Sequence, residues 1–72
     1  MAIINLLTDF GEKDGYVGVM KGVILSIAPE VKLVDLSHEL EPQNVLAGAM
    51  LLGRSLPFFP SGSIYLAVVD PG

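Results

Sequence analysis

Two patterns of hydrophobic and polar positions alternate along the chain, and they predict three strands and two helices. Short apolar runs are typical of buried strands, and they cover Ala2–Thr8, Val31–Ser37 and Ser63–Val69. Apolar residues at helical spacing predict a first helix at Gly15–Ala28. Pro29 ends this helix because the residue before a proline disfavours the α conformation. A second helix is predicted at Asn44–Leu56.

Polar residues precede each predicted helix. Asp14 is suited to cap the first helix, because its side chain can accept a hydrogen bond from a backbone N–H of the first turn. Glu41-Pro42 suits the start of the second helix, since proline is tolerated at the first helical position.

Strands that alternate with helices indicate βαβ units and a parallel sheet with right-handed crossovers. The predicted fold is therefore an α/β domain with the order βαβαβ, Rossmann-like in the broad sense. The second helix is apolar around much of its circumference, and the sequence ends in a turn after the third strand. Three parallel strands need cover on both faces, so we expect residues 1–72 to be a single, incomplete α/β domain.

Composition excludes several classes of protein. Hydrophobic residues make up 51% of the 72-residue chain, but the longest uncharged apolar runs are far shorter than the roughly 20 residues of a membrane-spanning helix. The absence of cysteine excludes disulfides and thiolate metal sites, and with no secretory signal in view it favours a cytoplasmic protein. Eight acids against four bases give a net charge of −4, which argues against nucleic-acid binding.

The ends of the three predicted strands carry the candidate functional residues. These ends are Thr8-Asp9, Ser37-His38 and Val69-Asp70. In an open parallel sheet they lie at one edge, and ligands bind in the crevice outside that edge. We therefore expect Asp9 and Asp70 to face one pocket, with Asp14 close to it.

Each of these residues also has a structural interpretation. Asp9 and Asp70 are common turn residues, and Asp14 is a common helix cap. His38 is more simply a surface histidine, or a loop histidine with satisfied hydrogen bonds. Asp35 lies in an apolar strand and is expected to be structural, because a buried carboxylate must be paired or hydrogen-bonded.

Other residues suggest packing more than binding. Lys21 is expected to be solvated, and Tyr16 and the Phe58-Phe59 pair to pack. The glycines do not form G-x-G-x-x-G, so the dinucleotide fingerprint is absent. From the residues alone, three functions stay open: an enzyme with an acidic pocket, a magnesium-dependent phosphohydrolase with Asp9, Asp14 and Asp70 as ligands, and a non-catalytic interaction fragment that docks through its apolar helix face.

Three longer strings carry a family resemblance. They are LTDFGEKDGYVGVMKGVI (Leu7–Ile24), VDLSHELEPQNV (Val34–Val45) and FFPSGSIYLAVVDPG (Phe58–Gly72). In this order they resemble the S-adenosylmethionine (SAM) hydrolases, also called SAM hydroxide adenosyltransferases and formerly domain of unknown function 62. The fluorinases and chlorinases belong to the same superfamily.

The resemblance implies an activity and an assembly. The family hydrolyses SAM to adenosine and L-methionine by attack of water at the ribose C5′ carbon, with SAM as substrate and with no cofactor or metal. It has an N-terminal α/β domain and a C-terminal β-barrel-like domain, the second of which is missing here. The resemblance also implies a homotrimer, in which SAM lies between the N-terminal domain of one subunit and the C-terminal domain of its neighbour.

The resemblance further implies roles for particular residues. Asp9 binds the ribose hydroxyls, Phe10 also belongs to the substrate-binding residues, and Asp14 lies near the methionine end. Asp70 contacts substrate and is the catalytic member of an Asp-Arg-His set that activates water. The Arg and the His of that set follow Gly72 in the family, so the 72-residue chain alone is expected to be inactive. The halogenating relatives lack a carboxylate at the position of Asp70, which therefore favours water as the nucleophile.

Overall fold

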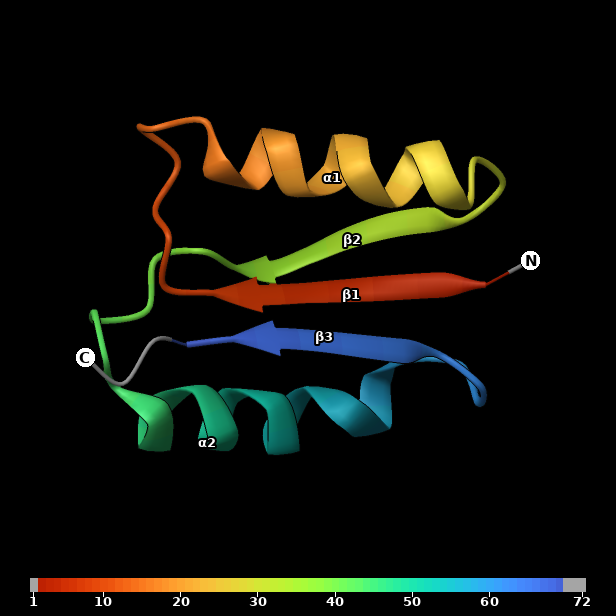
Figure 1. Ribbon diagram of the computed structural model, residues 1–72. Helices are drawn as coiled ribbons and strands as arrows, with labels where there is room; N and C mark the ends of the chain where they lie inside the picture. The colour runs from red at the N-terminus through yellow and green to blue at the C-terminus, as the bar shows by residue number, and fades with distance from the viewer. Residues whose placement is uncertain (1, 70–72) are drawn as a thin grey trace.

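All five predicted elements are present in the computed structural model, which describes residues 2–69. The strands are β1 (Ile3–Thr8), β2 (Lys32–Ser37) and β3 (Ile64–Val68), and the helices are α1 (Tyr16–Ile27), α2 (Val45–Ser55) and the short 3-10 helix η1 (Leu56–Phe58) (Figure 1). Each predicted strand and each of the two α-helices is confirmed to within one residue at either end.

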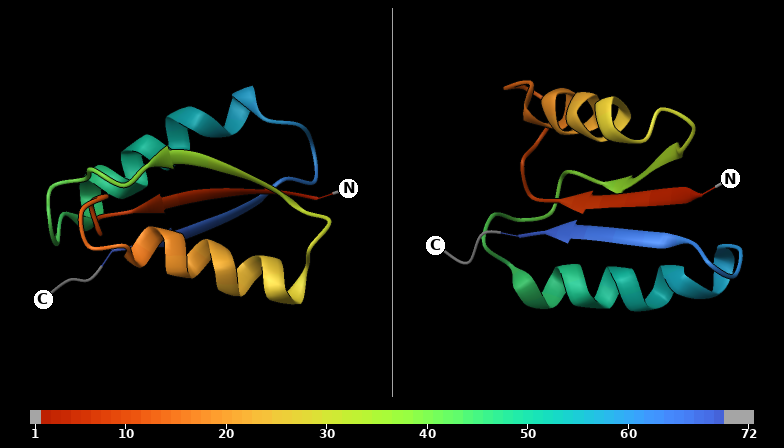
Figure 2. Two further views of the ribbon diagram at one scale, coloured as in Figure 1. Left: turned by 90° about the horizontal axis from the view of Figure 1, so that it is seen from above. Right: turned by 45° about the vertical axis from the view of Figure 1, so that its right-hand side comes forward.

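The three strands form a parallel sheet, as the sequence predicted, and their order in the sheet is β2-β1-β3. The chain moves from β1 to β2 on one side and then crosses back over β1 to reach β3. Because such crossovers are right-handed, this reversal requires the two helices to cover opposite faces of the sheet. The left view of Figure 2 shows α1 and α2 on opposite sides of the strands. The α/β fold is thus doubly wound.

The core is centred on β1, which is the strand with neighbours on both sides. Leu6 and Leu7 are almost fully inaccessible to solvent, and Val17 of α1 is also buried. Two polar residues of the same strand, Asn5 and Thr8, are equally buried. A buried polar side chain needs a hydrogen-bond partner, so the buried hydroxyl of Thr8 must have one near the end of β1.

The starts of both helices differ from the predictions. Asp14 does not cap α1: the N-cap is Gly15, whose φ of 76° lies in the left-handed region, and no side chain bonds to the first turn. Glycine adopts that conformation at little cost, so backbone geometry replaces a side-chain cap. Helix α2 begins after Pro42, and its N-cap is Asn44, whose side chain accepts a hydrogen bond from the Ala47 N–H.

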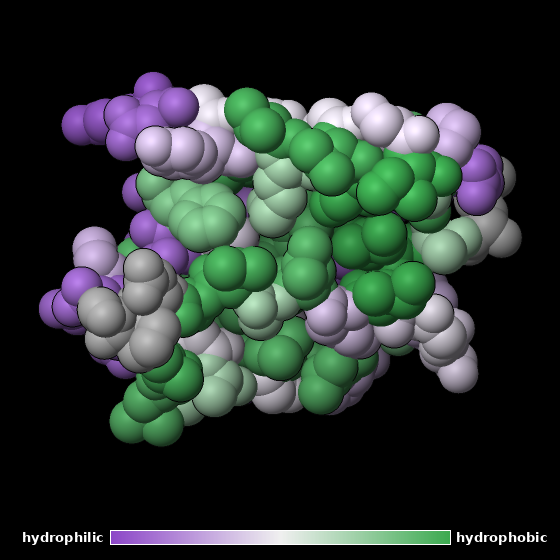
Figure 3. All heavy atoms as spheres, in the orientation of Figure 1, coloured by the Kyte–Doolittle hydropathy of each residue, from purple (hydrophilic) through white to green (hydrophobic). Residues whose placement is uncertain are grey.

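The outer faces of this small domain are apolar. Figure 3 shows hydrophobic side chains spread over much of the visible face, with hydrophilic ones mainly toward its left-hand and right-hand edges. The sequence predicted that α2 needs burial on more than one side, and that residues 1–72 do not supply all of this cover. Leu46 and Met50 are indeed exposed, as are Ile64 and Leu66 of β3. The reason is that nothing in residues 2–69 packs on the outer side of α2 or against the edge of β3 that faces away from β1.

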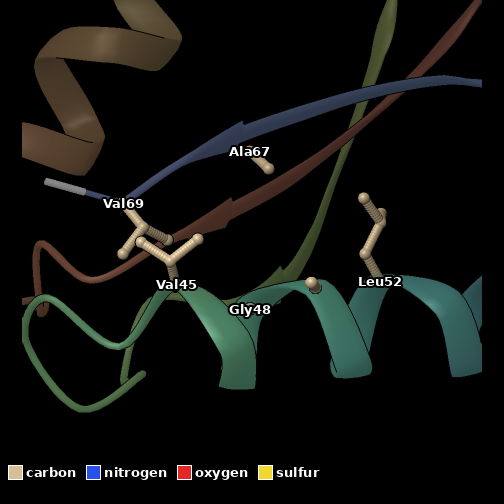
Figure 4. Close-up of a pocket in the computed structure, with 6 residues that line it drawn as sticks. Val45, Gly48, Leu52, Ala67 and Val69 are labelled. Carbon is tan, nitrogen blue, oxygen red and sulfur yellow. The ribbon is translucent and has the colours of Figure 1, made fainter. Parts of the chain in front are cut away.

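An apolar cavity of about 280 Å³ lies between α2 and β3 (Figure 4). It is lined by Val45, Gly48, Ala49, Leu52, Ala67 and Val69. Gly48 permits a close approach here, because a Cβ at this position would lie 3.3 Å from the side chains of Leu40 and Val69. Among residues 2–69 the lining contains no charged group.

No helix in residues 2–69 has the length and apolarity that crossing a bilayer would require.

The predicted packing role of Phe58-Phe59 is half right. Phe59 contacts Tyr65 edge-to-face, with ring centroids 6.1 Å apart, whereas Phe58 is 84% exposed. Lying in η1 at the surface, Phe58 has no layer to pack against in the described part of the chain.

Candidate functional site

The carboxyl ends of the three strands lie together, at the left of Figure 1. The strand order places a topological switch point beside β1, because the chain leaves β1 toward β2 on one side and reaches β3 on the other. Open α/β sheets bind ligands in the crevice at this point. The loop that follows β1, which begins with Asp9 and Phe10, therefore lies where a ligand site is expected.

Asp9 is held in place by the loop that follows β2. Its Oδ2 accepts a hydrogen bond of 3.0 Å from the backbone N–H of Gln43. Gln43 has a φ of 67°, which is uncommon for a residue other than glycine and costs about 1 kcal/mol or more. The bond engages one of the two carboxylate oxygens of Asp9. The other oxygen and the remaining lone pairs are suited to accept hydrogen bonds from a ligand.

Four side chains near the end of β1 form a continuous hydrogen-bonded chain: Thr8, His38, Asp35 and Lys21. Thr8 Oγ1 lies 2.7 Å from His38 Nδ1, and His38 Nε2 lies 2.7 Å from Asp35 Oδ1. The other oxygen of Asp35 accepts a 2.7 Å hydrogen bond from the ammonium group of Lys21. The chain therefore runs from the fully buried Thr8 at the end of β1 to a partly exposed ion pair between α1 and β2.

These contacts test three expectations, on His38, Asp35 and Lys21. His38 is not a surface residue: it is 2% exposed, and both of its ring nitrogens have partners. The alternative, a loop histidine with satisfied hydrogen bonds, is the correct one. Asp35 is paired as expected but is exposed, because β2 is an edge strand. Lys21 is ion-paired and only partly solvated, since Asp35 lies within reach of α1.

The Lys21 ammonium group lowers the pKa of Asp35 below its usual 3.8 by hydrogen bonding. Burial acts in the opposite direction, and the bond to His38 lowers the pKa further. A depressed carboxyl pKa stabilises the fold at pH values above the unfolded pKa, and this contribution is lost as the pH falls through the folded pKa.

We expect the free energy of unfolding to fall on acidification below about pH 4, and to fall less in Asp35→Asn than in the parent chain. The difference should be about 0.5 kcal/mol, because the Asp35 side chain is 40% exposed and solvent screens the pair. Urea unfolding followed by circular dichroism at about pH 5 and pH 2.5 measures it. Glu39→Gln, a change at an exposed neighbouring acid, should keep the parent profile. Equal losses in Asp35→Asn and the parent would contradict the assignment.

The sequence matches a known family over nearly its whole length. Residues 4–72 match the model of the SAM hydroxide adenosyltransferase N-terminal domain. The chain belongs to this family. The recognition of the family from three ordered motifs is thereby confirmed.

Similar proteins include two kinds of enzyme. A protein of Methanocaldococcus jannaschii named (R)-S-adenosyl-L-methionine hydrolase is 48% identical, over 96% of this chain and 27% of its own length. A protein of Actinopolyspora mzabensis named fluorinase is 36% identical, over 96% of this chain and 23% of its own length. The crystal structure of an uncharacterized conserved protein from Thermotoga maritima superposes with a TM-score of 0.92 at 45% identity, over 96% of this chain and 26% of that one. The chain thus spans about a quarter of the length of these relatives.

The structure brings only some of the predicted site residues of this SAM hydroxide adenosyltransferase domain together. Phe10 lies next to Asp9, is half-buried, and contacts Tyr16 edge-to-face with ring centroids 6.4 Å apart. Tyr16 is thus a packing residue as predicted, although it is 63% exposed. Asp14 is exposed in the same loop. Asp70 lies outside the described residues.

Sequence reasoning missed two features of the site. Gln43 carries no local signal, since its role depends on a left-handed backbone that glutamine rarely adopts. The link from Asp35 to His38 had a signal in their spacing of three at the end of a strand. Within residues 2–69 no three His, Asp or Glu side chains gather as a metal site; the magnesium alternative also needs Asp70, which lies beyond them.

Proposed function

We propose that the complete protein containing this segment hydrolyses SAM to adenosine and L-methionine. The observation that carries the proposal is the anchored Asp9 at the switch point of a domain that is 48% identical to a named SAM hydrolase. Residues 1–72 form the N-terminal part of a longer α/β domain. The rest of the polypeptide adds the C-terminal domain, and the protein assembles as a homotrimer in the cytoplasm.

Asp9 binds the 2′- and 3′-hydroxyls of the ribose. A carboxylate can accept hydrogen bonds from both hydroxyls of a vicinal diol, and such charge-assisted bonds are among the stronger ones in proteins. The bond from the Gln43 N–H fixes the orientation of the carboxylate before substrate arrives, which lowers the entropy lost on binding. Phe10 completes this part of the site, and Asp14 lies toward the methionine end, where an acid complements the sulfonium charge.

The reaction is a displacement at the ribose C5′ carbon. The water oxygen forms a bond to C5′, the C5′–S bond breaks, and its electron pair remains on sulfur, which leaves as the neutral thioether of methionine. The water proton passes to the Asp70 carboxylate and from there to solvent, and the other product is adenosine. A neutral leaving group needs no general acid, so the site must supply an aligned and partly desolvated water. Asp70 orients this water, and the cationic Arg and His of the set stabilise its hydroxide character.

A carboxylate at position 70 favours water over halide as the nucleophile. Two unit negative charges 4 Å apart repel each other by about 4 kcal/mol at an effective dielectric constant of about 20. A desolvated halide beside Asp70 would be disfavoured by an amount of this order, whereas a neutral water would donate a hydrogen bond to the carboxylate. We therefore assign hydrolysis, and not halogenation, to the complete protein.

Product analysis of the complete protein tests the proposal. Incubation with SAM and EDTA should give adenosine and methionine in equal amounts, as measured by liquid chromatography and mass spectrometry. The magnesium-dependent phosphohydrolase alternative requires the activity to disappear with EDTA and a phosphate ester to be the substrate. The 72-residue chain alone should show no turnover, since it lacks the Arg, the His and the C-terminal domain. If the complete protein associated with itself at higher concentration and did not bind SAM, the result would instead favour a non-catalytic interaction role.

A further inference from the structure

The hydrogen-bonded chain of Thr8, His38, Asp35 and Lys21 has a direction that its partners determine. Asp35 has a depressed pKa and is ionised at neutral pH, so it only accepts hydrogen bonds. His38 must therefore carry a proton on Nε2, the nitrogen that faces Asp35. Thr8 Oγ1 accepts a hydrogen bond of 3.2 Å from the Phe10 N–H. With His38 neutral, the Thr8 hydroxyl donates its own proton to Nδ1, and every group in the buried part of the chain is satisfied.

A hydroxyl-bearing residue, a histidine and an aspartate form nucleophilic triads in hydrolases, most often with serine as the nucleophile, but the geometry here excludes that role. Thr8 is 0% exposed, so no substrate atom reaches its hydroxyl. In the arrangement above its oxygen already donates one hydrogen bond and accepts another. The hydrogen-bonded chain therefore has a structural role, which is to position neighbouring residues.

The hydrogen-bonded chain positions the backbone of the loop that contains Asp9 and Phe10. Thr8 Oγ1 accepts from the Phe10 N–H, and the backbone carbonyl of His38 accepts a 2.7 Å hydrogen bond from the Gly11 N–H. His38 thus contacts the loop in two ways: its ring bonds to Thr8, and its backbone carbonyl bonds to Gly11. Asp35 fixes the ring of His38, and Lys21 fixes Asp35 from helix α1.

We propose that His38 is a positioning residue, which keeps the Asp9–Gly11 loop in the shape that binds a ribose diol. The nature of the ligand rests on the function proposed above, but the effect on the loop does not. Asp35 and Lys21 act as the outer support of the histidine. Because Asp9 acts in binding, loosening the loop should raise KM more than it lowers kcat.

Two substitutions at Thr8 separate the hydroxyl from the packing. Thr8→Val keeps the shape and removes the hydrogen bonds, whereas Thr8→Ser keeps the hydroxyl. In the complete protein, Thr8→Val should raise KM for SAM about tenfold, the effect of one lost hydrogen bond, with kcat within about threefold. Thr8→Ser should stay close to the parent. Ser26→Ala removes an exposed hydroxyl that bonds only its own helix, and it should change neither constant.

Amide hydrogen exchange in the complete protein, measured without any substrate, tests the loop. The Phe10 and Gly11 amides should exchange about tenfold faster in Thr8→Val. His38→Asn, which is too short to reach Asp35, should also speed their exchange and covers the case in which Thr8→Val does not fold. Parent-like exchange and KM in both variants would overturn the proposal, as would a fall in kcat with KM unchanged. If the complete protein does not act on SAM, the proposed function fails, and exchange at Phe10 and Gly11 still decides the role of His38.

Discussion

Replacing Asp70 by Asn in the complete protein is expected to lower kcat for SAM hydrolysis about a thousandfold. Asn preserves the size of the side chain but has no negative charge to orient water and accept its proton. General bases contribute about 10²–10⁴-fold to rates, and a thousandfold loss is the middle of that range. KM should change far less than kcat, because the interaction with the attacking water is made mainly in the transition state.

Steady-state kinetics with purified variants would measure this effect. Glu30→Gln, at an exposed acid in the turn between α1 and β2, serves as the control and should match the parent. A kcat for Asp70→Asn within tenfold of the parent would remove Asp70 from the catalytic role. Water activation would then have to come from groups outside residues 1–72.

Replacing Asp9 by Ala should raise KM for SAM about a hundredfold. The loss combines two charge-assisted hydrogen bonds to the ribose, each worth roughly a factor of ten. Asp9→Asn should raise KM only about tenfold. Its amide oxygen can still accept the hydrogen bond from the Gln43 N–H, although the negative charge is lost. The kcat of both variants should stay within a few fold of the parent, since ribose binding is the same in the ground and transition states.

Titration with a non-hydrolysable SAM analogue by calorimetry provides an independent measure of the same affinity. Glu12→Gln alters an exposed acid of the same loop and should leave binding unchanged. If Asp9→Ala bound SAM as tightly as the parent, Asp9 would be a turn former anchored to Gln43, with no part in recognition.

The order and bounds of the elements could be predicted because each has a local cause. The three apolar runs are long enough only for strands, and Pro29 forces the first helix to end. The helix starts were harder, because they depend on backbone angles that the side chains do not reveal. A left-handed Gly15 begins α1 where an Asp14 cap was predicted, and Asn44, two residues after Pro42, caps α2.

The place of the site followed from parallel topology, but its internal contacts did not. Asp9 was found because it follows a strand at the binding edge. The link of Lys21 to Asp35 joins residues 14 positions apart on different elements, and the bond of Asp9 to Gln43 joins residues 34 positions apart. Both depend on how loops and helices pack against the sheet, which hydrophobic periodicity does not specify.

Family resemblance, and not spacing, supports the roles of Asp14 and Asp70. Asp14 lies in an exposed stretch of the loop after β1, and Asp70 follows the last described residue. For each, the residue type and its position after a strand are compatible with a turn as well as with a site. Only the ordered motifs distinguish these alternatives, so the kinetic experiments on these residues carry more weight than further inspection of the sequence.

The origin of the 5′-oxygen of adenosine distinguishes hydrolysis of SAM at C5′ from every alternative. The complete protein should be incubated with SAM and EDTA in H₂¹⁸O, and the adenosine analysed by tandem mass spectrometry. Attack of water at C5′ predicts one ¹⁸O atom in the 5′-hydroxyl of adenosine and none in methionine. Adenosine without ¹⁸O, a halogenated nucleoside as the main product, or no reaction until magnesium is added would show that the complete protein is not a SAM hydrolase of this kind.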